Sequence, residues 1–252
     1  MLICPVCKEK LNKQDHSLKC PNNHSFDFAK EGYVNLLLGS KSGDKKGDSK
    51  ESARARHQFL NKDYYAALKT AMMNRMNGTV LDICCGEGYY DDYDGILYGF
   101  DISKEMIRLA AKSKKNNFYF VGNLASIPIE VSSIDTALHL FAPFHEKEFS
   151  RVLKENGVLY SVIPGENHLF ELKEILYDEP YKNDEKTPET QVLNLVSKTK
   201  VSDKIEIGRE DLKELFAMTP YFYHTSDSDK ARLEKVNKIN LTVEFVILEY
   251  RK

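Results

Sequence analysis

The stretch "LDICCGEGYY", residues 81–90, joins the end of an apolar run to a glycine-rich turn. Such a strand and turn typically hold a nucleotide-like cofactor in α/β proteins. A dinucleotide site needs a third glycine, but Asp91 stands at that position, three residues after Gly88. The turn also lacks the Lys-Ser or Lys-Thr pair of a Walker phosphate-binding loop. A ligand without phosphates needs fewer glycines in the turn, because no phosphate group has to approach the backbone N–H groups closely. The turn therefore favours S-adenosylmethionine over a dinucleotide or a nucleoside triphosphate.

Strands and helices alternate around this turn. The runs "TVLDIC", "ILYGFD", "NFYFVGN", "SIDTALHLF" and "GVLYSVIP" predict five strands. Helices are predicted in "SKEMIRLAAKS", where Ser103 suits the N-cap and Met106, Ile107 and Ala110 share a face, and in "HEKEFSRVLKENG". This order predicts a parallel sheet covered on both faces. We therefore expect an α/β, Rossmann-like class I S-adenosylmethionine-dependent methyltransferase domain.

Residues at the ends of these strands are the candidate cofactor contacts. Asp82 and Gly88 belong to the first strand and its turn. Asp101 closes the second strand, 19 residues after Asp82, where it would accept hydrogen bonds from the ribose hydroxyls. It could also cap the following helix, and the two roles are compatible. Asn123 and Leu124, after the third strand, would hold the adenine.

Cysteines cluster at the N-terminus in two short pairs. Cys4-Pro-Val-Cys7 is followed twelve residues later by Cys20-Pro-Asn-Asn-His24. Thiolates and imidazoles at this spacing form tetrahedral zinc cages, and four protein ligands leave no open position for catalysis. A module this small depends on its metal for folding energy. The pattern predicts a structural Zn²⁺, with His16 as a rival fourth ligand.

Composition indicates an ordinary globular protein of 252 residues, with 42% hydrophobic and 29% charged residues. No apolar run approaches the roughly 18 residues that span a bilayer. The odd number of cysteines, five, suits a reducing compartment, so we expect a cytoplasmic protein. Residues 1–60 carry 11 Lys and Arg against 7 Asp and Glu, whereas the remainder is acidic. This basic end could dock on phosphate, or it could be an ordinary solvated surface.

We predict three segments along the chain. Residues 1–38 form a zinc-binding RNA-recognition module, and residues 39–52 a flexible linker that contains a run without apolar residues. Residues 53–252 form the methyltransferase domain, with a helical and loop-rich insertion at about 166–219. Within it we expect helical periodicity over 51–76, a helix over 166–179, loops to about 204, a short helix over 208–220, and a buried last strand over 239–250.

The chain resembles the RlmA family of large-subunit rRNA guanine-N1 methyltransferases, which join a zinc module to a class I methyltransferase domain. The resemblance covers nearly the whole chain. It rests on "CPVC…CPNNHSFDFAKEGYVNLL", "LDICCGEGYY", "GFDISK", "FAP" at residues 141–143, "PGENHLFELKEILYDE" and "MTPY" at residues 218–221. The first and fifth of these motifs are distinctive, whereas many methyltransferases share the cofactor motif.

The resemblance implies roles for individual residues. The zinc ligands would be Cys4, Cys7, Cys20 and His24, and cofactor contacts would come from Tyr65, Gly86, Glu87 and His168. Cys84 stands where the family usually has glycine, and we expect it to adopt a negative φ. The segment between Gly88 and Asp101 is also short, with room for one or two helical turns. Cys84 and Cys85 are read as reduced residues of a cofactor loop, not as a metal or redox pair.

The implied reaction is transfer of a methyl group to N1 of a guanine in a hairpin of 23S rRNA, which needs loss of the N1 proton. His139, His145 and Glu146 are weak candidates for the base, and the catalytic residue is otherwise unassigned. Phe141 and Phe144 could stack on the guanine, although core packing suits at least one of them.

RNA phosphates would meet the basic residues of the module and linker, which are Lys8, Lys10, Lys13, Lys19, Lys45, Lys46, Arg54 and Arg56. The sequence leaves open a homodimer, and it predicts no membrane partner. Two alternative functions also stay open at this point: a small-molecule methyltransferase with a zinc ribbon, and a non-catalytic ribosome-binding relative.

Overall fold

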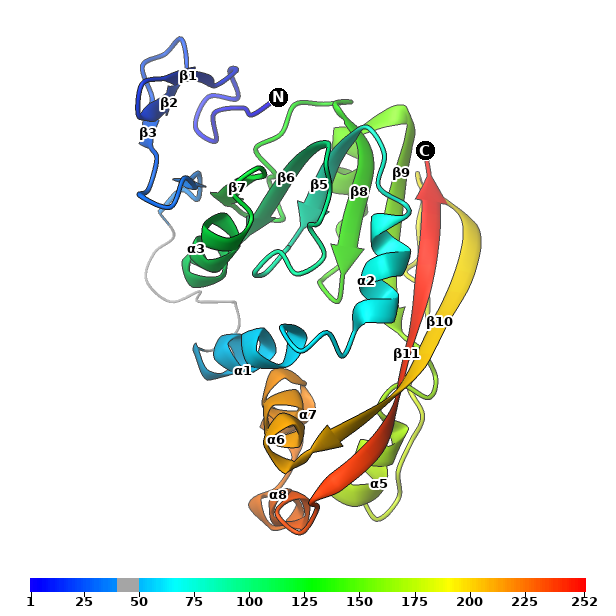
Figure 1. Ribbon diagram of the computed structural model, residues 1–252. Coiled ribbons are helices and arrows are strands. Elements are labelled where there is room, and N and C mark those ends of the chain that lie inside the picture. Colours follow the sequence, from blue (N-terminus) through cyan, green and yellow to red (C-terminus); the bar gives the residue numbers. More distant parts are fainter. Residues whose placement is uncertain (40–49) are drawn as a thin grey trace.

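The computed structural model describes residues 1–39 and 50–252. At its centre is an eight-stranded sheet in the order β10-β11-β9-β8-β5-β6-β7-β4 (Figure 1). The five predicted strands are β5 (Thr79–Ile83), β6 (Ile96–Asp101), β7 (Phe118–Val121), β8 (Ile134–Leu140) and β9 (Leu153–Pro164). Neighbours among these five pair in parallel. The predicted α/β fold with a parallel sheet is therefore confirmed for this part of the chain.

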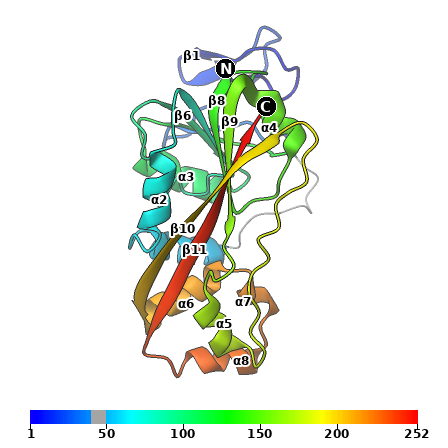
Figure 2. The ribbon, with the colours of Figure 1, turned by 90° about the vertical axis from the view of Figure 1, so that its right-hand side faces the viewer.

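Helices cover both faces of the parallel strands. Helices α2 (Ala66–Met73) and α3 (Lys104–Ser113) lie on one face, and α4 (Glu146–Val152) lies on the other (Figure 2). Helix α3 begins as predicted, because the Ser103 side chain accepts a hydrogen bond from the backbone N–H of Met106. Its apolar residues are buried against β7. Helix α4 is shorter than predicted, since β9 already begins at Leu153.

The carboxyl-terminal half adds a long antiparallel strand pair. Strand β10 (Asn194–Gly208) pairs along its length with β11 (Lys238–Arg251), which in turn pairs with β9. The prediction of loops to residue 204 is wrong here, because residues 194–204 belong to β10. The last strand, β11, is buried as predicted. Helices α5 (Phe170–Leu176), α6 (Arg209–Met218), α7 (Tyr221–His224) and α8 (Asp227–Leu233) gather at one end of this pair (Figure 2).

The N-terminal module combines a small sheet with an extra edge strand. Strands β1 (Asn12–Gln14), β2 (Ser17–Lys19) and β3 (Ser25–Asp27) form the small sheet, and β4 (Val34–Asn35) pairs in parallel with β7. A backbone bridge joins Leu2 to Ile129, just before β8. Residues 34 and 35 are thus part of the large sheet, although we predicted them within the separate module of residues 1–38.

The chain between the module and β5 forms two helices. Helix α1 (Lys50–Leu60) ends in a turn that contains Asp63 at a φ of 57°, and α2 follows at Ala66. The apolar periodicity over 51–76 runs through this break because both helices bury their apolar residues in the same core. Between Gly88 and β6 the structure has turns and no helix. None of the helices in the described ranges is long and apolar enough to cross a membrane.

Candidate metal centre and cofactor site

Two tight turns position the predicted zinc ligands. In the first, the backbone N–H of Lys8 donates to the carbonyl of Cys4, and Lys8 adopts a φ of 66°. In the second, the N–H of Asn23 donates to the carbonyl of Cys20, and Asn23 adopts a φ of 62°. Each turn folds its two ligands back toward one point. The prolines after Cys4 and Cys20 suit such turns.

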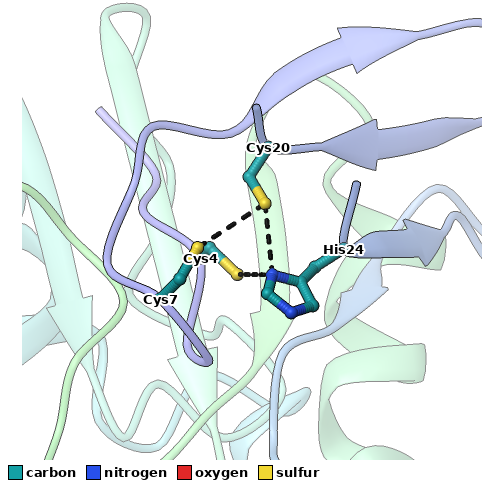
Figure 3. Close-up of side chains that lie close together, drawn as sticks. All are labelled: Cys4, Cys7, Cys20 and His24. Carbon is teal, nitrogen blue, oxygen red and sulfur yellow. Dashed lines mark hydrogen bonds between the residues drawn. The ribbon is translucent and has the colours of Figure 1, made fainter. Parts of the chain in front are cut away.

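The four ligand atoms converge to one small site (Figure 3). All lie within 4.8 Å of one another. The Sγ atoms of Cys7 and Cys20 are 3.6 Å apart, and His24 Nδ1 lies 3.6 Å from Cys4 Sγ and 3.3 Å from Cys20 Sγ. Ligands about 2.0–2.3 Å from a tetrahedral zinc stand about 3.3–3.8 Å apart. The spacing therefore fits one Zn²⁺ held by these four residues, and His16 is not part of the group.

A second site lies at the carboxyl ends of β5, β6 and β8. One cavity there is lined by the turn after β5, by residues 101–103 at the end of β6 and by residues 140–143 at the end of β8. Helices α1, α3 and α6 help to enclose it. Five of the nine predicted cofactor contacts line it, namely Tyr65, Asp82, Gly86, Glu87 and Asp101. In open α/β sheets, ligands bind at this end of the strands.

Asp101 is fixed by the backbone around it. Its Oδ2 accepts a hydrogen bond from the N–H of Gly86 at 3.1 Å, and its Oδ1 accepts one from the N–H of Ser103 at 2.8 Å. The carboxylate thus joins the turn after β5 to the start of α3. Asp101 lines the cavity and also orders the chain before the helix, while its contact with a ribose stays a prediction.

Asp82 is a buried carboxyl group of the cavity that has no basic partner among the described residues. Its side chain is 1% exposed, and its oxygens meet no donor among the described residues apart from the neighbouring carboxyl group of Asp91, with which Asp82 can share a proton. Burial raises the pKa of Asp82 well above its usual range, and the adjacent Asp91 and the more distant Asp101 add to this rise. An unpaired buried carboxylate is costly unless a cation meets it. The ammonium group of S-adenosylmethionine would supply that cation, so the residues present fit this cofactor.

Asp91 belongs to a buried network that we did not predict. The Tyr119 hydroxyl donates to Asp91 Oδ2 at 2.8 Å, and the carboxyl group of Asp91 also neighbours that of Asp82. Gly88 makes this arrangement possible, because a Cβ there would lie 2.7 Å from the Tyr119 hydroxyl and 2.9 Å from Asp91 Oδ2. Gly88 therefore does not line the cavity but allows a close approach beneath it. A lone aspartate in a turn gives no sequence signal for such a network.

Glu87 connects the turn to α1. Its carboxylate is largely buried, and His57 Nδ1 donates a hydrogen bond to Oε2 at 2.8 Å. Burial raises the pKa of Glu87, and His57 and Arg56 partly offset this rise. Arg56 lines the same cavity. We had placed Arg56 among phosphate contacts, and the structure puts it beside the cofactor turn.

Tyr65, which lines the cavity, packs against His168. Their ring centroids are 5.9 Å apart, and His168 also packs against Phe245 at 4.6 Å. His168 Nδ1 accepts a hydrogen bond from the N–H of Glu244, and burial lowers the His168 pKa to about 3. A neutral His168 thus supports Tyr65 without lining the cavity itself. Asn123 and Leu124 also lie outside the cavity lining.

Two of the three candidate bases are engaged elsewhere, and the third, His145, has a buried Nδ1 without a hydrogen-bond partner among the described residues. His139 is 3% exposed, its ring nitrogens contact Ser161 Oγ and the carbonyl of Pro143, and burial lowers its pKa to about 4. Glu146 accepts hydrogen bonds from three consecutive backbone N–H groups at residues 191–193. His145 precedes α4, with Nδ1 buried. None of the three lines the cavity.

Phe141 and Phe144 differ in their surroundings. Phe141 is 43% exposed, lines the cavity and adopts a φ of 56°. Non-glycine residues in this conformation are strained and often occur at functional sites. Phe144 packs against His139, Phe149 and Tyr250. Phe144 is therefore part of the core, and Phe141 is the aromatic residue available to a ligand.

The adjacent cysteines do not form a reactive pair. Both are free thiols, and neither belongs to the group of converging zinc ligands. Burial raises the pKa of Cys84 to about 12 and that of Cys85 well above its usual range, so both stay protonated at neutral pH. Cys84 adopts a φ of 58°. The expectation of a negative φ is wrong, because this turn needs a left-handed residue at the position where a glycine is usual.

Two family models match the chain. Residues 2–40 match the model described as "RlmA, N-terminal", a zinc ribbon, and residues 81–161 match a methyltransferase domain. The chain thus joins an RlmA-type N-terminal zinc ribbon to a methyltransferase domain. The match to the zinc ribbon covers the four converging ligands, and the match to the methyltransferase domain covers the strand ends that line the cavity. The protein is therefore a methyltransferase that carries a structural zinc site.

Two relatives align with this chain over nearly its whole length. A 23S rRNA (guanine(748)-N(1))-methyltransferase from Streptomyces fradiae is 27% identical over 98% of this chain and 95% of its own length. A Bacillus subtilis protein with the provisional name 23S rRNA (guanine-N(1)-)-methyltransferase YxjB is 28% identical over 98% of this chain and 96% of its own length.

Proposed function

We propose that the protein methylates N1 of a guanine in a hairpin of 23S rRNA, with S-adenosylmethionine as the methyl donor. The observation that carries the proposal is the joint presence of the four-ligand zinc ribbon and a cavity lined by Asp82, a buried carboxyl group without a basic partner among the described residues. The two full-length relatives named for this activity support the choice of substrate.

Different cavity residues would bind different groups of the cofactor. When bound, S-adenosylmethionine supplies an electrophilic methyl group on a sulfonium. Asp82 would pair with its ammonium group, and Asp101, already held by two backbone N–H groups, would accept hydrogen bonds from the ribose. Methyl transfer depends mainly on holding donor and acceptor in line. These fixed carboxylates would provide that orientation.

Phe141 would hold the target base. It lies after β8 at the cavity and keeps a large exposed fraction, unlike the buried aromatic residues around it. RNA-modifying proteins stack unpaired bases on exposed aromatic rings. The guanine would have to leave its stack to reach the cavity, which suits a loop nucleotide of a hairpin.

Mass spectrometry of an rRNA transcript treated with the protein and S-adenosylmethionine tests the proposal. We expect one N1-methylguanine per hairpin, and none with the Asp82→Ala variant. Methylation of a small metabolite with no mark on RNA would contradict the proposed substrate, and absence of any cofactor binding in calorimetry would contradict the activity itself. A homodimer stays a prediction, which sedimentation velocity would check.

A further inference from the structure

A hollow lined by basic side chains lies where the N-terminal module meets α3. Its basic members are Lys30 from the turn between β3 and β4, and Arg108, Lys112 and Lys115 from α3 and the chain just after it. Glu31 is its one acidic residue, so the lining carries a net charge of about +3 at neutral pH. The whole chain has a net charge of −2, so this positive charge is a local concentration.

Three of the four basic side chains are free to bind an external anion. Lys30, Lys112 and Lys115 are exposed, and none forms an ion pair with another described residue. Arg108 pairs with Glu105 at 2.7 Å and stands one helical turn from Lys112. The same helix face therefore presents a row of cations.

Gly32 leaves room for a ligand between these cations. It has a φ of 96°, and a Cβ built on it would meet no heavy atom within 4 Å. The backbone is therefore exposed in the hollow, and a phosphate group could approach it closely. The remaining lining residues, Ala111 and Asn117, are small or polar.

The position of the hollow suggests which anion occupies it. The zinc ribbon contacts residues 128–130, which precede β8, so it lies at the amino ends of the parallel strands. The cofactor cavity lies at their carboxyl ends. Helix α3 runs between the two ends, since Ser103 lines the cavity while Lys112 and Lys115 line the hollow (Figure 1).

We propose that this basic hollow binds backbone phosphates of the RNA substrate and guides the RNA from the zinc ribbon toward the cavity. The proposal rests on the proposed function. From Ser103 to Lys112 and Lys115 a helix advances roughly 14–18 Å. A stacked strand advances about 3.4 Å per nucleotide, so ~4–5 nucleotides span this length. One side of a short stem could thus contact the hollow while its loop enters the cavity.

A neutralising double variant of the full-length protein tests the hollow. Lys112→Gln with Lys115→Gln removes two free cations without changing buried groups. The matched control is Lys147→Gln with Lys235→Gln, two exposed lysines outside the hollow and without ion pairs to described residues. Affinity for an rRNA hairpin transcript is measured by fluorescence anisotropy over a series of salt concentrations.

We expect the hollow variant to bind RNA on the order of tenfold more weakly, with the slope of log affinity against log salt reduced by about 2, while the control keeps the wild-type slope. Calorimetry should show the same affinity for S-adenosylmethionine in all three proteins. Equal RNA affinity and equal slopes in the two double variants would overturn the role of the hollow while leaving rRNA methylation by the wild type intact. If the wild type methylates no RNA, the proposed function itself fails.

Discussion

His57 Nδ1 lies 2.8 Å from Glu87 Oε2, so a hydrogen bond joins helix α1 to the cofactor turn. Because Glu87 lines the cavity, we expect His57→Ala to cost about 1 kcal/mol of the free energy of unfolding and to weaken S-adenosylmethionine binding several-fold. Calorimetry and urea denaturation measure the two effects. His16→Ala, an exposed histidine of the zinc ribbon, is the control and should leave cofactor binding unchanged.

Asp82→Asn should change stability and cofactor binding in opposite directions. The pKa of Asp82 is raised in the folded protein, mainly by burial, so the folded state holds this proton at a pH where the unfolded state has lost it. Stability therefore falls as pH rises above about 4 through the folded pKa. The variant should be more stable than wild type at pH 7–8 without cofactor, and it should bind S-adenosylmethionine more weakly.

Asp135→Asn should change stability at neutral pH in the opposite direction from Asp82→Asn. The Lys154 ammonium holds the pKa of Asp135 below its usual range, with a further contribution from the N–H of Thr79. This interaction contributes stability above about pH 4 and is lost on acidification. The variant should lose stability at neutral pH and keep its cofactor affinity. Thermal melts from pH 4 to 8 compare both variants, and a parallel response would contradict the burial argument for Asp82.

Replacing Cys84 tests the strain in the cofactor turn. A left-handed conformation costs an L-residue about 1–2 kcal/mol, and glycine avoids this cost but adds about 0.4–1 kcal/mol of unfolded-state entropy. We expect Cys84→Gly to raise the free energy of unfolding by up to about 1 kcal/mol, Cys84→Ala to give no gain, and Cys84→Val to lose stability. Urea denaturation measures all three. A gain for alanine equal to that for glycine would show that the thiol, not the backbone, is unfavourable.

Substituting Phe141 should lower RNA methylation, whereas substituting Phe144 should lower stability. Phe141→Ala removes an exposed ring at the cavity, so RNA methylation should fall at least about tenfold while cofactor affinity and stability stay near wild type. Phe144→Ala removes a ring packed among three aromatic residues and should cost on the order of 3 kcal/mol of stability. Single-turnover methylation and urea denaturation distinguish them. Unchanged methylation by Phe141→Ala would exclude it as the stacking platform.

Loss of zinc should affect RNA methylation and spare cofactor binding. Deleting residues 1–38 would also remove β4 from the large sheet, so a ligand variant is the sharper change. Cys7→Ser should lower zinc content and unfold the ribbon, because a structural zinc contributes on the order of 10 kcal/mol to such modules. Metal analysis, RNA methylation and calorimetry with S-adenosylmethionine check this. Full methylation without bound zinc would contradict a role for the ribbon in RNA recognition.

Local sequence patterns predicted much of the fold, and the elements that they missed have identifiable physical causes. The strand from Thr79 and the N-cap at Ser103 depend on nearby residues and were predictable. Strand β10 was missed because it is an edge strand whose residues are mostly exposed, so its sequence lacks the apolar alternation of a buried strand. Asp63 breaks the helical pattern in the middle, but residues on both sides pack into one core and keep the periodicity.

The site was predictable where one segment supplies it. The zinc ligands come in short pairs, and the cofactor turn is continuous in sequence. The Asp91 network needs Tyr119 from another strand, and the basic hollow needs Lys30 beside Lys112, so only the fold brings these residues together. Lys45 and Lys46, predicted to meet phosphates, lie outside the described residues.

The zinc ribbon is attached to the methyltransferase domain at two places, so its distance from the cofactor cavity is fixed. The N-terminal amino group pairs with Glu130 at 3.1 Å, and β4 is hydrogen-bonded to β7, so the ribbon cannot swing about a single tether. With the RNA bound as proposed, the spacing between ribbon and cavity would set the length of stem that brings a base to the cavity. Inserting one base pair into the stem would rotate and shift the target base past the cavity, while changes in stem sequence at constant length would be tolerated.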